Sequence, residues 1–190
     1  MHQDRLQQNR HPAVEVRISS GSRSSQSMPY LGAAVPIGLV GAALVAIYVL
    51  VLDLLAGHAL GTPNALGALV FRGEPLSLDA PIRPGLVLGY TLLHAATFIA
   101  VAAAAVSAEF TLTRQGVSLP IQLVSGMIGI FVGLQLVFVA LTILLEISWA
   151  GQIGFERVVV SNAIAALGMA LTVYLRGEGR RTTRVPVYVR

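Results

Sequence analysis

The chain has 190 residues, of which 55% are hydrophobic and only 12% are charged, and its formal net charge is +4. Soluble domains carry about 25% charged residues, so this composition cannot cover a water-exposed surface and predicts a membrane protein. Cysteine is absent, which excludes disulfides, thiolate metal sites and cysteine nucleophiles. All 13 basic residues are arginines. Most of them flank apolar segments near the two ends, where membrane topology explains them without nucleic acid.

Four segments are long and apolar enough to cross a bilayer, which takes ~20 predominantly apolar residues. Lipid offers no hydrogen-bond partners, so each segment must satisfy its own backbone amides as a helix. The first segment follows a long polar leader and is too long for the apolar part of a signal peptide. The sequence therefore predicts an all-α membrane protein, a four-transmembrane-helix bundle at residues 30–175 with spans at about 30–56, 84–108, 118–147 and 153–175.

Arginines are distributed unevenly on the two sides of these spans. The polar leader (residues 1–29) holds four, the link between the second and third spans holds one, and the tail (residues 176–190) holds five. The opposite side holds three: Arg72, Arg83 and Arg157. Because cytoplasmic segments carry the basic excess, both termini are predicted to be cytoplasmic. The general plan is similar to that of small bacterial four-span proteins, which implies the cell inner membrane and no particular mechanism.

The longest connection, between the first two spans, contains a predicted helix start at Thr62 and Pro63. A threonine hydroxyl suits an N-cap and proline suits the first helical position. Residues 64–71 then give apolar turns too short to span, so we predict a short interfacial helix on the outer surface. An ordinary ordered loop is the alternative.

Both ends of the chain contain apolar residues that alternate with other residues, a pattern typical of half-buried strands. Short strands at the cytoplasmic termini are therefore possible, with disorder as the alternative. The alternating residues are Val14, Val16 and Ile18 near the start, and Val185, Val187 and Val189 near the end.

Each span also carries small residues at four-residue spacing, which let helix backbones approach closely in lipid. These stripes predict packing within the bundle or against another subunit. The sequence alone does not distinguish between these two roles. The main candidates are Ser125, Gly129 and Gly133 in the third span, Gly85 and Gly89 in the second, and Gly38 in the first.

Ionisable residues inside a span are costly and are candidates for function. One interpretation is a proton or cation site in the outer half of the bundle, with His94 as the titrating group. The alternative is structural, with carboxylates marking helix ends, an arginine counter-ion and a histidine bonded to a neighbouring helix. The candidate residues are Tyr90, His94, Asp53, Glu146, Arg157 and Asn162.

Known cofactor and enzyme patterns are missing from the sequence. A di-iron bundle needs Glu-x-x-His pairs, and a haem held between two helices needs two histidines within spans, whereas His94 alone qualifies. No nucleotide fingerprint or nucleophile–base pair is visible. We therefore expect no metal, no cofactor and no enzymatic activity.

These observations favour a non-enzymatic membrane scaffold or accessory subunit that packs against a larger membrane complex. The expected partners are membrane lipids and either other membrane subunits or a second copy of the chain. The alternative is a small transporter or channel component with a proton or cation site around His94, Asp53 and Glu146.

Overall fold

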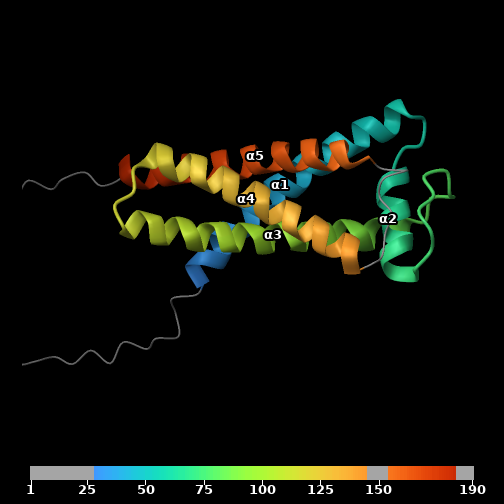
Figure 1. Cartoon of the computed structure of the whole chain (residues 1–190), viewed down its shortest axis with the longest axis horizontal. Helices are drawn as coiled ribbons and strands as arrows, with labels where there is room; N and C mark the ends of the chain where they lie inside the picture. Colours follow the sequence, from blue (N-terminus) through green and yellow to red (C-terminus); the bar gives the residue numbers. More distant parts are fainter. Residues whose placement is uncertain (1–27, 145–153, 183–190) are drawn as a thin grey trace, which may run out of the picture.

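A computed structural model describes residues 28–144 and 154–182 of the chain, and every regular element in those residues is a helix. Four long helices run along the bundle, and α2 lies across one of its ends (Figure 1). The all-α prediction with four spans and one short extra helix is confirmed. The helices are α1 (Met28–Leu55), α2 (Gly61–Arg72), α3 (Pro84–Arg114), α4 (Leu119–Leu144) and α5 (Phe155–Thr182).

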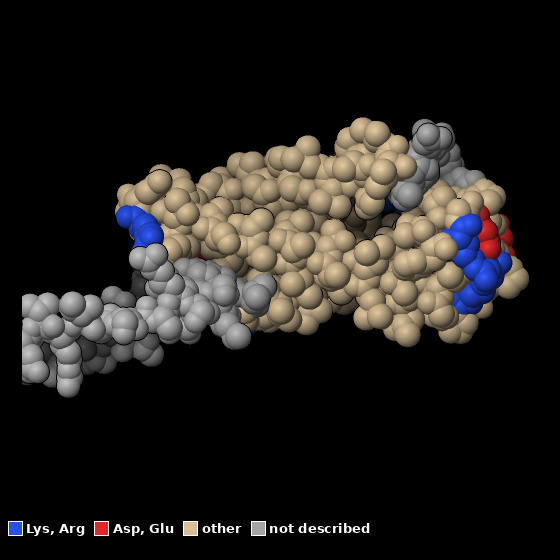
Figure 2. Space-filling model, turned by 90° about the horizontal axis from the view of Figure 1, so that it is seen from below, with Lys and Arg blue, Asp and Glu red and all other residues tan. Residues whose placement is uncertain are grey.

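The four long helices turn most of their apolar surface outward. The most apolar windows of these helices have mean hydropathies of 1.9 to 2.6, yet no more than 33% of any window is buried inside the bundle. Leu55, Ile143 and Leu144 are 80%, 73% and 76% exposed. Charged side chains gather at the two ends of the molecule, with a long uncharged surface between them (Figure 2). Lipid is the solvent that such a surface requires, so the chain is a multi-pass membrane protein.

Two helices extend beyond the predicted spans. The α3 helix continues past residue 108 to Arg114, and α5 continues past residue 175 to Thr182. Polar turns at a helix end need no lipid, so hydropathy underestimates the length of such helices. The predicted terminal strands lie outside the described residues, and cytoplasmic termini stay a prediction. The described chain begins and ends at the end of the bundle opposite α2 (Figure 1), as an even number of crossings requires.

The core is centred on α1, which packs against both α3 and α5. Ile37, Phe98 and Met169 are at most 4% exposed and fill the space between these helices. Gly38 brings α1 and α3 together most closely: a Cβ added there would lie 2.5 Å from the Cα of Ile99. The glycine therefore sets the distance between these two backbones.

We predict that Gly38→Ala destabilises the protein by about 1–3 kcal/mol, because backbone atoms must move to admit the methyl group. Gly32→Ala on the same helix is the matched control, since a Cβ there has no neighbour within 4 Å. Unfolding by SDS in mild detergent, followed by circular dichroism, measures both variants. Equal stability of the two variants would contradict the close approach of α1 and α3.

Candidate functional site

A cavity of about 400 Å³ lies between the helices at the end of the bundle that α2 covers. All five helices contribute to its wall, which is mostly apolar. It brings together five of the six polar residues singled out in the sequence: Asp53, Tyr90, His94, Arg157 and Asn162. The sixth, Glu146, lies outside the described residues.

His94 is the central polar residue of this wall. Its ring lies 5.8 Å from the Tyr90 ring and 4.7 Å from the Phe98 ring, centroid to centroid, so three successive turns of α3 present aromatic rings. The imidazole lies close to the backbone of Ala42 in α1. The Nε2 atom is buried and has no hydrogen-bond partner within the described part of the chain. Burying a nitrogen without a hydrogen-bond partner costs about 1–3 kcal/mol, which sets His94 apart from the other polar residues of this wall.

Two further polar residues lie on the α5 side of the cavity. Asn162 is 7% exposed, and its Nδ2 donates a hydrogen bond of 2.7 Å to Oε1 of Gln135 in α4. This bond satisfies two mid-span amides against each other, as hydrocarbon surroundings demand. Arg157 begins α5 and is largely exposed, with part of its surface on the cavity.

Asp53 holds the beginning of α2. The carboxylate is 2% exposed and accepts hydrogen bonds from the Thr62 backbone amide (2.8 Å) and the Thr62 hydroxyl (2.6 Å). The predicted N-cap role of Thr62 is wrong: the N-cap is Leu60, at φ 64°, and it makes no side-chain cap bond. Asp53 of α1 takes over this role because its negative charge suits the positive end of the α2 dipole.

His58 lies next to this carboxylate. Its Nδ1 is 3.8 Å from Oδ1 of Asp53, too far for a hydrogen bond. Nδ1 is buried and unpartnered among the described residues. A Cβ on Gly61 would lie 2.8 Å from the same Nδ1, so the imidazole leaves room for nothing larger than glycine at the first position of α2.

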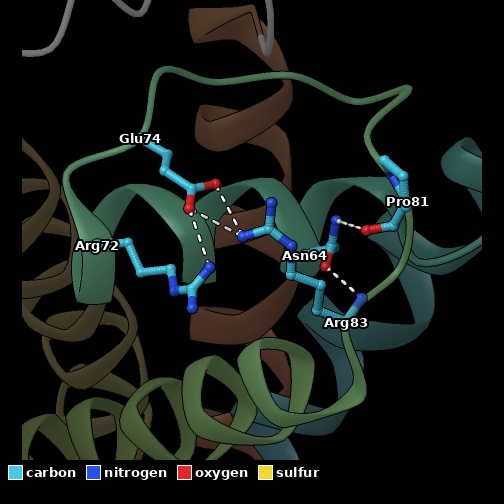
Figure 3. A network of polar contacts seen from close by, with 5 residues as sticks. All are labelled: Asn64, Arg72, Glu74, Pro81 and Arg83. Atoms are coloured by element: carbon cyan, nitrogen blue, oxygen red, sulfur yellow. Dashed lines mark hydrogen bonds and ion pairs between the residues drawn. The ribbon is translucent and has the colours of Figure 1, made fainter.

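Asn64 fixes the return of the chain from α2 to α3, a role that could not be predicted from the sequence. Its side chain is almost fully buried, donates to the Pro81 carbonyl (3.3 Å) and accepts from the Arg83 amide (2.9 Å). Figure 3 shows both bonds bridging the α2 helix and the returning loop. The Asn64 side chain thus satisfies two backbone groups of the loop that have no partner in a helix or strand.

Glu74 adds an ion-pair cluster at the outer surface of the same loop. Its carboxylate accepts from Nη1 of Arg83 at 2.8 and 2.9 Å and from Nη1 of Arg72 at 3.1 Å (Figure 3). The hydrogen bond from Arg83, with the charges of both arginines, lowers the pKa of Glu74 below its ordinary value. Pairing an exposed carboxylate with two guanidinium groups stabilises the loop modestly.

The chemistry available to the site is hydrogen bonding in an apolar cavity. Within residues 28–144 and 154–182, no three histidine, aspartate or glutamate side chains gather closely enough to hold a metal ion. No protein-family model, curated protein or solved structure matches this chain. Any function must therefore be inferred from the geometry of this protein alone.

We predict that Asp53→Ala destabilises the protein by about 1–3 kcal/mol, because the α2 amide loses its acceptor inside the bundle. Asp53→Asn should cost less, since a carboxamide oxygen still accepts one of the two bonds. Asp79→Ala, an exposed position in the following loop, is the control and should leave stability unchanged. SDS unfolding of the three variants measures the differences, and an Asp53→Ala variant as stable as the control would contradict the capping role.

A second prediction concerns the pH dependence of the loop. A carboxyl whose pKa is lowered by folding stabilises the folded state above its ordinary pKa of about 4.3 and loses this effect as the pH falls through the lowered value. The loop should therefore loosen only at pH values below the ordinary carboxyl pKa. The chain has no cysteine, so a spin label on Ser77→Cys reports loop mobility at a single position.

In this experiment the label should be immobile at pH 7 and become mobile on acidification. The Glu74→Gln variant should be more mobile than the wild type at pH 7 and change little with pH. Identical pH profiles in the two proteins would show that the ion pairs do not hold the loop.

Proposed function

We propose that this protein is a non-enzymatic accessory subunit of the bacterial inner membrane, with cytoplasmic termini, that receives a transmembrane helix of a larger partner on its α3–α4 face. The proposal depends on a groove of about 670 Å³ between these helices, towards the end opposite α2. Small residues line both walls of this α3–α4 groove: Ala100, Ala104 and Ala108 on α3, and Gly126, Gly129 and Gly133 on α4.

A comparison of the glycines supports this assignment. Gly41 of α1 and Gly168 of α5 are used inside the bundle: a Cβ on Gly41 would collide with Met169, and one on Gly168 would collide with Leu44. In α4, a Cβ on Gly126 or Gly129 would meet nothing within 4 Å. The bundle therefore gains no close approach from the α4 glycines.

Glycine in a helix interior costs about 0.5–1 kcal/mol relative to alanine. A lipid chain adapts to any side chain and gains little from this smooth surface, whereas another helix backbone can approach only small residues closely. Matching stripes on α3 and α4 suit a helix that lies along both. A partner helix is therefore the occupant that best accounts for the groove.

A small transporter with a proton or cation site at His94, Asp53 and Glu146 is the second candidate. The buried imidazole of His94 in a cavity favours it. The hydrogen bonds from Thr62 to both oxygens of Asp53 favour a structural carboxylate instead. We therefore place the accessory subunit first.

The test is co-purification of the tagged full chain in mild detergent. A leucine at Gly129 fills the α3–α4 groove without disturbing the chain's own packing, so Gly129→Leu should fold normally and lose at least about tenfold in the recovery of its partner, a loss of roughly 1.4 kcal/mol or more. Gly32→Leu, an open glycine of α1 outside the groove, is the matched control and should retain the partner.

Larger membrane subunits in stoichiometric amounts with wild type and Gly32→Leu, but not with Gly129→Leu, support the proposal. A wild-type protein that purifies without any other subunit would refute it. Equal recovery of the partner with Gly129→Leu would show that the partner does not bind at the α3–α4 face.

A further inference from the structure

We propose that the cavity at the α2 end binds an anionic lipid, with one acyl chain between the helices and its carboxylate or phosphate head on the guanidinium of Arg157. The proposal is independent of the accessory role, because it concerns the cavity and the accessory role concerns the α3–α4 groove. It depends on three features of the cavity: a long apolar wall, an open positive charge and a position beside the bilayer.

The wall of the cavity suits a hydrocarbon chain. The volume of about 400 Å³ falls within the range of ligand pockets, about 300–1,000 Å³, whose walls are mainly apolar. On α3 the lining residues extend from Val87 to Phe98, which is about 16 Å at 1.5 Å per residue. Leu66 of α2 and Leu134 of α4 are typical of the apolar side chains around it. This length accommodates most of an acyl chain, and burying the chain there removes apolar surface from water.

Arg157 supplies the positive charge of this wall. It is the third residue of α5, it lines the cavity, and it is exposed, so it lies where the cavity meets the surface. Its side chain makes no ion pair or hydrogen bond with any residue that the structure describes. A guanidinium group binds a carboxylate or a phosphate through two parallel hydrogen bonds. The positive end of the α5 dipole adds to the attraction for an anion.

The carboxylates near the cavity do not neutralise Arg157. Asp53 is the one acidic residue in the described part of the wall, and its oxygens accept hydrogen bonds from Thr62. Glu156 does not line the cavity, and its carboxylate lies over Gly154, where an added Cβ would collide with it. The charge of Arg157 is therefore open, and an anionic head is the complementary ligand group.

The position of the cavity matches the way a lipid lies in a bilayer. Three of its lining residues, Ile47, Leu50 and Leu141, are also 60%, 37% and 41% exposed on the apolar surface of the bundle. A chain dissolved in the bilayer can therefore enter from the side. Arg157 lies at the start of the candidate span Phe155–Arg176, the depth at which lipid headgroups and long basic side chains meet.

The experiment titrates the delipidated full chain in mild detergent with oleate and counts the bound molecules by native mass spectrometry. Methyl oleate, which has the same chain but no charge, is the matched ligand. Oleate should bind as one saturable molecule, and the methyl ester should bind about tenfold more weakly, the loss expected for a hydrogen-bonded charge.

A second pair of lipids identifies the source of the anionic head. Dioleoylphosphatidylglycerol carries a phosphate, and dioleoylglycerol has the same chains without one. Tighter binding of oleate than of the phospholipid would assign the cavity to a fatty acid. Tighter binding of the phospholipid, with dioleoylglycerol about tenfold weaker, would assign it to a membrane phospholipid. Both results support the anionic site.

The variants separate the charge from the cavity. Arg157→Gln should bind oleate and methyl oleate with equal affinity, whereas Arg72→Gln removes an arginine outside the wall and should retain the preference for oleate. Ala46→Phe places a ring in the cavity from α1 and should abolish binding of both ligands. Ala43→Phe, an exposed α1 position outside the wall, should retain both. Circular dichroism checks that each variant is folded.

Three results would overturn the proposal. Equal binding of oleate and methyl oleate to the wild type, or an unchanged preference in Arg157→Gln, would show that Arg157 does not hold the head. Undiminished binding to a folded Ala46→Phe protein would place the lipid on the outer surface instead of in the cavity. No saturable binding of any of the four lipids would exclude this ligand class. The Gly129→Leu test bears on none of these results, so failure here and failure of the accessory role are distinguishable.

Discussion

Polar groups in hydrocarbon must find their partners within the protein, and this constraint shapes every part of the bundle. Hydroxyls within the spans satisfy it locally: Thr97, Ser107 and Thr172 each donate to the carbonyl one turn back in their own helix. The mid-span amides of Asn162 and Gln135 satisfy each other. Against this background the Nε2 atom of His94 stands out, because it is buried and has no hydrogen-bond partner among the described residues.

The α2 helix shows how a short segment can be held across the end of an apolar bundle. The amide of Thr62, its second residue, is held by Asp53 of α1, and Asn64 ties the returning loop to it. A Cβ on Gly67 would lie 2.5 Å from the Leu86 carbonyl oxygen, so α2 rests on the first turns of α3. These contacts from both sides make α2 a fixed wall of the cavity, and they explain why so small a helix buries half of its residues.

Composition and hydropathy were enough to predict the four spans and the short helix, because lipid imposes length and apolarity on each span regardless of its neighbours. The cluster of candidate polar residues was also predictable in part, since spacing alone places Tyr90 and His94 on one face of a helix. The role of Asp53 was not, because it needs the chain to reverse at Leu60 with φ 64°, and leucine gives no signal of a left-handed residue.

The glycines also show what could not be predicted from the sequence alone. Gly38 and Gly129 read alike in the sequence as members of small-residue stripes. Which of them serves an internal contact depends on which helices become neighbours, and that follows from the whole bundle rather than from either helix. The structure separates them: Gly38 lies against the α3 backbone, whereas Gly129 faces open space.

The cavity and the α3–α4 groove meet in the middle of the bundle. Thr97 of α3 and Val137 of α4 belong to the walls of both. A helix bound in the groove would contact these two side chains, so we expect its binding to alter the shape of the cavity. Such coupling is reciprocal by thermodynamic necessity. Gly129 therefore probes the groove separately, since it lines the groove and does not line the cavity.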